Sequence, residues 1–141
     1  MSGKFSRDKG QRAERAIIKL LQPVVNDVYE KNGLEVPSLE RNLMQANKGG
    51  HDIVGLEWLA LEVKHQETLH ITQWWEQAVR QAGENRIPVL LFKQSRSQWR
   101  VMLPSVLDAG DWFINVTAEI RLEDFLKWFK MFLSHKVREK S

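Results

Sequence analysis

The chain has 141 residues, of which 43% are hydrophobic and 28% charged. This length predicts one domain spanning residues 1–141, and the composition suffices for a packed core, which argues against a disordered chain. The absence of cysteine excludes disulfides, zinc–cysteine sites and thiol nucleophiles. No apolar run approaches the roughly 18 residues of a membrane span, and the polar first residues lack the apolar core of a signal peptide. We therefore expect a cytoplasmic protein with no membrane partner.

The formal net charge is only +3, but positive charge gathers at the two ends of the chain. The first fifteen residues contain Lys4, Arg7, Lys9, Arg12 and Arg15, and the last seven contain Lys136, Arg138 and Lys140. Basic ends suit a phosphate-rich partner, and they also occur as solubilising ends. Both interpretations stay open at this point.

The first half of the chain is predicted to open with a helix over residues 6–29, preceded by a basic tail over about residues 1–8. Pro23 is expected to kink or shorten this helix. Strands are expected at residues 39–46, 52–56 and 58–65, with a turn at residues 47–50. The link between the last two strands is short, so they are expected to form a hairpin.

The second half begins with a predicted helix over residues 71–85. Strands follow at residues 87–93 and 98–103, with a short extra strand at residues 112–117. A closing helix is expected over about residues 121–138. This order predicts an α/β fold with a mixed central sheet of about five strands flanked by helices.

The feature of this sheet most relevant to chemistry is the segment from Asp52 to Lys64. Side chains alternate between the faces of a strand, so Glu62 and Lys64 share one face while Leu59, Leu61 and Val63 share the other. If the hairpin forms, Asp52 lies near the same end as Glu62 and Lys64. A solvated strand face with an ion pair is the ordinary alternative for a Glu-x-Lys sequence.

Two converging carboxylates would suit a magnesium ion, which prefers oxygen ligands and keeps several waters. Asp52 and Glu62 are the predicted side-chain ligands, and the backbone carbonyl of Val63 is a third candidate. Such a metal lowers the pKa of a bound water and stabilises phosphate charge. Lys64 is expected to orient that water or to stabilise the transition state.

The pattern of Asp52 followed by Glu62-Val63-Lys64 resembles the signature of the PD-(D/E)XK (restriction-endonuclease-like) nuclease superfamily. Most of the chain is similar to the archaeal-type Holliday junction resolvases, which also occur in viruses. The similarity includes residues 9–15, residues 62–64, Glu76-Gln77-Ala78 and residues 122–126. We favour a viral member because the chain is compact and divergent, which would place it in the host cytoplasm.

This resemblance implies a homodimer that cuts four-way DNA junctions with Mg²⁺, for which Mn²⁺ is expected to substitute. Asp52, Glu62 and Lys64 match the signature, and Glu14 matches an acidic residue of the family's first helix that acts on the metal, here expected through water. The implied catalytic residues are therefore Glu14, Asp52, Glu62 and Lys64. Gln77 matches a glutamine in the helix after the catalytic strands.

The sequence departs from the family pattern at two positions. The proline before the signature aspartate is His51 here; we favour a solvated turn histidine over a phosphate contact. The small residue often found two positions after the lysine is Gln66, whose place on the active-site face would let it contact DNA. These departures leave the nuclease signature of Asp52, Glu62 and Lys64 intact.

DNA binding is expected to rest on phosphate contacts, because a junction is read by shape more than by sequence. The predicted DNA-binding residues are Lys4, Arg7, Lys9, Arg12, Arg41, Lys48, Gln66, Gln77 and Arg80. Lys48 is the best placed by sequence, and Arg12 comes next. The apolar closing helix is expected to serve both the core and a dimer interface, since a symmetric dimer presents two matched sites.

Two other functions stay open. One is a restriction- or repair-type nuclease acting on duplex or other branched DNA. The other is a DNA-binding module of the same fold without catalysis, which the presence of Asp52, Glu62 and Lys64 disfavours.

Overall fold

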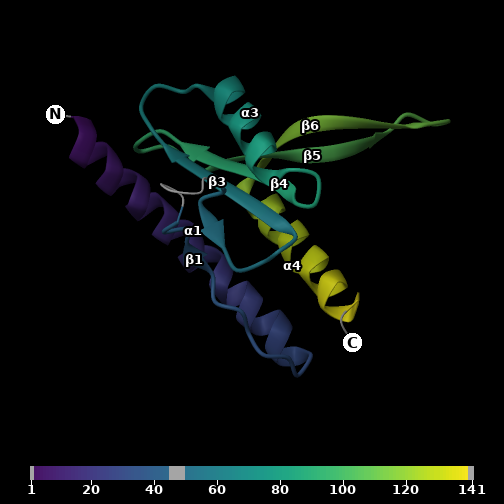
Figure 1. Ribbon diagram of the computed structural model, residues 1–141. Helices are drawn as coiled ribbons and strands as arrows, with labels where there is room; N and C mark the ends of the chain where they lie inside the picture. The colour runs from purple at the N-terminus through teal and green to yellow at the C-terminus, as the bar shows by residue number, and fades with distance from the viewer. Residues whose placement is uncertain (1, 45–49, 140–141) are drawn as a thin grey trace.

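The computed structural model describes residues 2–44 and 50–139. Its elements are α1 (Ser2–Lys31), β1 (Glu40–Arg41), β2 (Ile53–Val54), β3 (Leu59–His65), α3 (Ile71–Ala82), β4 (Ile87–Lys93), β5 (Arg100–Asp108), β6 (Phe113–Arg121) and α4 (Leu122–Glu139). The strands form a six-stranded sheet in the order β1-β2-β3-β4-β5-β6 (Figure 1). Among these strands, β3 and β4 pair in parallel and the other neighbours are antiparallel. The predicted mixed α/β fold is confirmed, with one strand more than the expected five.

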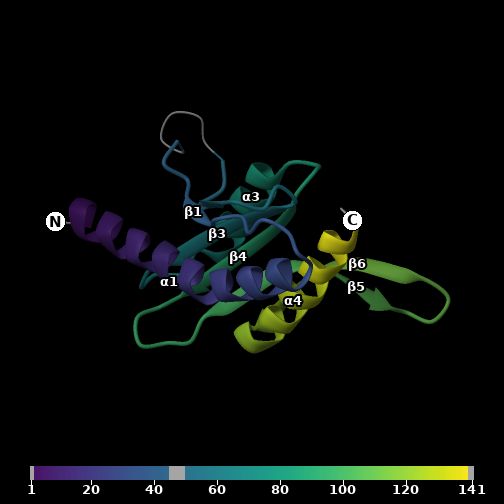
Figure 2. The same ribbon diagram turned by 90° about the horizontal axis from the view of Figure 1, so that it is seen from below.

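Helices α1 and α4 cover one face of the sheet and α3 covers the other (Figure 2). The apolar residues of α1 recur three or four positions apart, which makes one side of the helix apolar. Those that are buried are Ala13, Ile17, Leu21, Val25 and Val28. In α4 the spacing is four throughout, and Phe125, Phe129, Leu133 and Val137 are fully buried. The core function predicted for the closing helix is thereby confirmed.

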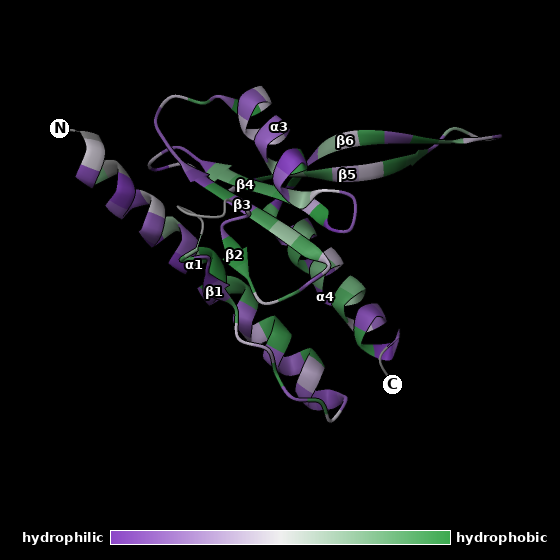
Figure 3. Ribbon diagram, viewed as in Figure 1, coloured by the Kyte–Doolittle hydropathy of each residue, from purple (hydrophilic) through white to green (hydrophobic). Residues whose placement is uncertain are grey.

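The centre of the sheet is buried on both faces. Leu91 of β4 packs with α1 and α4, whereas Leu90 and Phe92 pack against Trp74 and Ala78 of α3. Figure 3 shows hydrophobic residues concentrated along β3 and β4. A strand covered on both sides is expected to be apolar at successive positions, which is why the β4 sequence does not alternate.

The first helix differs from its prediction at both its start and its middle. It begins at Ser2, so the basic tail predicted for about residues 1–8 is wrong, and Lys4 and Arg7 lie on helical backbone. Pro23 lies inside the helix without ending it. Pro23 is exposed while Leu21 and Val25 are buried on the apolar side, so core packing holds the helix together where proline removes one hydrogen bond.

Several strands and one helix also end at other residues than predicted. The strand predicted at residues 39–46 is reduced to β1, with residues 45 and 46 outside the described part, and β2 is shorter than 52–56. The helix predicted to reach residue 85 ends at Ala82, because Gly83 adopts a positive φ of 66°. By contrast, β5 and β6 are each nine residues long, and the strand predicted to end at residue 103 continues through Pro104.

No helix in the described part of the chain combines the length and apolar character of a membrane span.

Candidate active site

The β2–β3 hairpin brings Asp52 against β3, as predicted. Ile53 pairs with Leu61, and the Asp52 amide donates to the Leu61 carbonyl at 2.9 Å. One carboxylate oxygen of Asp52 (Oδ2) accepts a hydrogen bond from the Val63 amide at 2.7 Å. This bond fixes the carboxylate beside the middle of β3.

Glu62 is a fully buried carboxyl group on the opposite face of β3 from Leu61 and Val63. Neither of its carboxylate oxygens has a hydrogen-bond donor among the residues described. Burial, followed by the charge of Asp52, raises the pKa of Glu62 to about 9, although Lys64 acts in the opposite direction. A buried carboxylate is unfavourable unless a proton or a cation neutralises it. Glu62 is therefore expected to bind either a proton or a cation.

The backbone of Val63 points toward Asp52. Within one strand residue, the amide N–H and the carbonyl point to the same side. Since the Val63 N–H donates to Asp52, the Val63 carbonyl is also directed toward β2 and away from β4. The backbone oxygen predicted as a metal ligand thus lies on the side of the strand where Asp52 is held.

Helix α1 adds a third carboxylate. Glu14 accepts a hydrogen bond from Arg41 Nε at 2.8 Å, and both side chains are largely shielded from solvent. Burial raises the pKa of Glu14 despite the opposing Arg41 hydrogen bond, and the charge of Asp52 raises it further. Glu14 therefore feels the charge of Asp52 while Arg41 holds it in place.

Asp52, Val63 and Glu14 line one cavity of about 570 Å³ between the start of α1 and the end of β3, and the fully buried Glu62 is not among its lining residues. Its lining residues are Phe5, Lys9, Gly10, Glu14, Asp52, Val63, Lys64, His65, Gln66, Glu67 and Thr68. The predicted residues Glu14, Asp52, Lys64, Gln66 and Lys9 thus come together from three parts of the chain. The sequence prediction missed His65, Glu67 and Thr68, which simply continue the chain beyond Lys64.

The donor atoms here fit a magnesium ion held by few protein ligands. In the described residues, no three His, Cys, Asp or Glu side chains are grouped closely enough to form a metal site by themselves. Asp52 and Glu62 supply two carboxylates, however, and the Val63 carbonyl supplies a backbone oxygen. Magnesium commonly takes one or two carboxylates and keeps several waters, so Glu14 would act through water.

The predicted DNA-binding cations have different environments. Lys4, Arg7, Arg12 and Arg80 are exposed. Lys9 forms an ion pair with Glu67 at 2.8 Å, and Arg41 pairs with Glu14. Lys48, which the sequence favoured most, lies outside the described residues.

Helix α3 contacts the chain near Asp52 through Gln81. The Gln81 side chain accepts a hydrogen bond at 2.7 Å from the amide of Gly50, two residues before Asp52. Gln77, the predicted residue, is half-buried one turn earlier on the same helix. Gln81 could not be singled out from the sequence, because its partner is a backbone amide 31 residues away.

The expectation of a solvated histidine at position 51 is wrong. His51 is buried, and its ring nitrogen Nδ1 has no hydrogen-bond partner in the described structure. Burial, followed by the charge of Arg86, lowers the pKa of His51. The residue that replaces the family's proline therefore packs inside the protein as a neutral ring.

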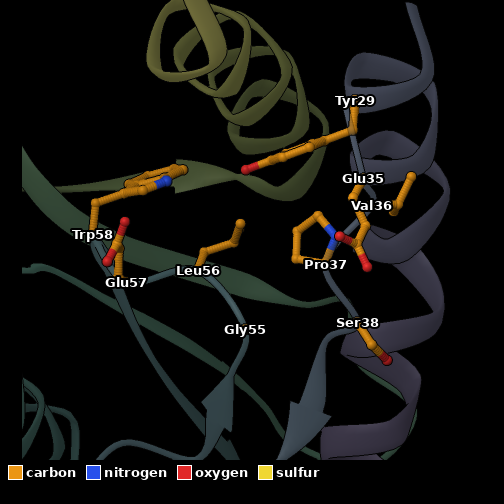
Figure 4. A pocket seen from close by; sticks show the side chains of 9 residues that line it. All are labelled: Tyr29, Glu35, Val36, Pro37, Ser38, Gly55, Leu56, Glu57 and Trp58. Atoms are coloured by element: carbon orange, nitrogen blue, oxygen red, sulfur yellow. The ribbon is translucent and has the colours of Figure 1, made fainter. Parts of the chain in front are cut away.

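A second cavity of about 540 Å³ lies at the other end of the β2–β3 hairpin (Figure 4). It is lined by Tyr29, Glu35, Val36, Pro37, Ser38, Gly55, Leu56, Glu57 and Trp58. Glu35 and Glu57 are its charged residues, and none of the described lysines or arginines lines it. Negative charge disfavours phosphate, so this cavity does not suit DNA.

Comparison with protein families matches the sequence of this chain to one family model. The model of the family described as "Phage putative PDDEXK endonuclease" matches residues 5–125. The match covers α1 from residue 5 onward, the Asp52–Lys64 segment and the sheet. No curated protein and no solved structure is similar enough to this chain to match it.

Proposed function

Because this chain belongs to the phage PD-(D/E)XK endonuclease family, we propose that it is a Mg²⁺-dependent endonuclease that cuts four-way DNA junctions. The observation that carries the proposal is the convergence of Asp52, buried Glu62 and Lys64. Among the described residues, no donor reaches either carboxylate oxygen of Glu62, and the pKa of this group is raised to about 9. A bound cation would neutralise it, and Mn²⁺ is expected to substitute for Mg²⁺.

When bound by Asp52 and Glu62, the metal would supply an acidified water and positive charge for the phosphate. The chain's own groups have separate tasks. The Val63 amide fixes the orientation of the Asp52 carboxylate, and Arg41 holds Glu14 at the cavity wall. Lys64, on the same strand face as Glu62, places an ammonium group where charge develops on the scissile phosphate.

The junction as substrate is favoured by the resemblance of residues 9–15 and 62–64 to the pattern of the junction resolvases, and by the position of the basic residues. Lys4, Arg7 and Arg12 lie exposed on α1, whose first turns extend beyond the sheet next to the cavity (Figure 1). Phosphate contacts from such a helix would position DNA without reading bases. A junction also needs two matched cuts, which a symmetric dimer would provide.

The test is cleavage of a labelled four-way junction beside a linear duplex of the same sequence, with Mg²⁺, with Mn²⁺ and with chelator. We expect paired nicks in the junction, little cutting of the duplex and no cutting with chelator. Equal rates on both DNAs would reject the junction proposal and favour a restriction- or repair-type nuclease.

The remaining alternative is a DNA-binding module without catalysis. This alternative would be supported if the wild-type protein binds junctions but cuts no DNA with either Mg²⁺ or Mn²⁺.

A further inference from the structure

The β5–β6 hairpin projects from the body of the molecule, and its outer strand β6 forms one edge of the sheet (Figure 1). The nine residues of β6 pair with β5 along their whole length. The outer edge of β6 has no strand beside it in the described sheet. Long exposed edges of this kind are templates for pairing with another strand.

The end of this hairpin, which we call the tip, is unusually apolar for a surface. Trp112 is 80% exposed and Phe113 is 73% exposed, and Val106, Leu107 and Ile114 are each more than half exposed. Exposed apolar patches of this kind mark interaction sites. Asp108 and Asp111 flank the turn, so the tip would repel the phosphates of DNA. The tip therefore suits a protein surface.

The backbone of β6 is arranged for pairing on its outer edge. The Ala109 amide bonds to the Trp112 carbonyl across the turn, so even-numbered residues of β6 direct their backbone groups toward β5. Odd-numbered residues, including Thr117, direct theirs outward. Consistent with this, Thr117 lies opposite Pro104, which has no N–H to offer.

The other end of the hairpin has a cavity. It measures about 650 Å³ at the root of β5 and β6, and Trp99, Ile120 and Leu122 provide apolar walls. The same strand thus has protruding aromatic side chains at one end and an apolar hollow at the other. An antiparallel strand pair brings such ends together.

We propose that two copies of this chain form a symmetric dimer through antiparallel pairing of their β6 strands, centred on Thr117. This is the alignment that pairs the full strand, and it sets odd-numbered residues opposite odd-numbered ones. Phe113 then lies opposite Arg121 of the second copy. Trp112 reaches the cavity at the root of β5 and β6 in that second copy. Glu119 faces Asn115 and Arg121 faces Phe113, so no like charges meet.

The surface that the two hairpins would bury is large enough for a stable dimer. Trp112 and Phe113 from both copies provide four aromatic side chains, at roughly 150–250 Å² each when buried. Together with the paired strands, they would approach or exceed the approximately 1,000 Å² of a biological interface. Seven interstrand steps of roughly 4.8 Å would separate the two β3 strands, about 34 Å in all.

The dimer proposal is based on the exposed residues and the free strand edge of the hairpin. It does not depend on the proposed nuclease activity. The first experiment measures mass by light scattering and sedimentation at micromolar concentration. Wild type is expected to be a dimer. Trp112→Lys and Thr117→Pro are expected to weaken dimerisation at least about tenfold. Because the Thr117 N–H points outward from an edge strand, proline there should leave the monomer folded.

Met131→Lys is the matched control, because Met131 is 74% exposed and lies outside the hairpin, on α4, the helix that the sequence predicted as a dimer interface and that this proposal leaves out of it. It should remain dimeric. Circular dichroism and thermal unfolding would show that each variant is folded, and Trp112→Lys carries the test if the proline variant is not.

The second experiment tests the alignment, using the absence of natural cysteine. Thr117→Cys should form a disulfide-linked dimer under mild oxidation, since the two Thr117 residues are direct partners. Asn115→Cys should not, because its copy in the partner would be about 13 Å away at roughly 3.3 Å per residue.

Three results would overturn the proposal. They are a monomeric wild type, a dimer that Trp112→Lys leaves intact, and equal crosslinking of the two cysteine variants. A monomeric wild type whose hairpin variants lose DNA binding would instead assign the hairpin to DNA.

Discussion

At the residue scale, Glu62 differs from an ordinary surface glutamate in its burial and in its pKa. It is fully buried, and its raised pKa of about 9 means that it keeps a proton at neutral pH when no cation is bound. The sequence predicted that Glu62, Lys64 and Asp52 would meet, because strand alternation and a short hairpin require it. The sequence could not show the burial of Glu62, which depends on the packing of distant elements.

The pH dependence of stability follows from this pKa. With a folded pKa of about 9 against an ordinary 4.5, the folded state binds a proton that the unfolded state has lost. Stability from this group therefore falls as the pH rises from about 4.5 to about 9, at up to about 1.4 kcal/mol per pH unit. Glu62→Gln, which cannot ionise, should unfold at a higher temperature than wild type at pH 8 to 9 without metal.

The measurement is thermal unfolding with chelator across that pH range. Glu123→Gln, at an exposed position on α4, serves as the control. Parallel pH profiles for Glu62→Gln and wild type would contradict the account of this carboxyl group.

Lys64 gives a prediction about rate. Lys64→Met should reduce cutting at least about 100-fold, because it removes positive charge aimed at the transition state, while junction binding is largely kept. Single-turnover cleavage and a binding assay would separate the two effects. Lys127→Met, an exposed lysine on α4, should cut like wild type. Equal loss of binding and cutting would mean that Lys64 merely attracts DNA.

At the element scale, α3 holds the chain just before Asp52 through the hydrogen bond from Gly50 to Gln81. Gln81→Ala should loosen the position of Asp52 and lower the cutting rate about tenfold with little change in KM. Gln77→Ala, one turn away, should weaken DNA binding instead if Gln77 contacts DNA. A larger rate loss from Gln77→Ala than from Gln81→Ala would reverse these two assignments.

The hairpin that carries Asp52 depends on Gly55. This residue has a φ of 136°, and a Cβ there would lie 2.7 Å from the Ser38 carbonyl and 2.9 Å from Leu39 Cδ2. Gly55→Ala should therefore destabilise the protein by about 1–3 kcal/mol. Chemical denaturation would measure this loss. Gly110 also has a positive φ, but a Cβ added there would lie more than 4 Å from the described atoms outside its chain neighbours, so Gly110→Ala should destabilise the protein less.

At the scale of the whole molecule, local patterns predicted the order of elements. For the closing helix they predicted a contribution to the core, but they did not separate the buried series of Phe125, Phe129, Leu133 and Val137 from Trp128 and Phe132. The ends of elements were predicted less well where tertiary contacts decide them. Pro104 reads as a strand end in sequence, yet it fits opposite Thr117 because that position needs no N–H from it.

The same limit applies to the site. Asp52, Glu62 and Lys64 follow from the sequence, but the pairing of Arg41 with Glu14 joins α1 to β1 across 27 residues. Arg41 was predicted from its charge alone to bind DNA. Burial of His51 was likewise missed, because a turn position usually implies solvent.

The central claim is that Asp52 and Glu62 form a metal-dependent cutting centre. The most direct measurement is cleavage of a labelled four-way junction with Mg²⁺ by wild type, Asp52→Asn and Glu62→Gln, with junction binding measured on the same samples. We expect wild type to cut and both variants to bind without detectable cutting. Cutting by either variant at a rate close to that of wild type would contradict the account.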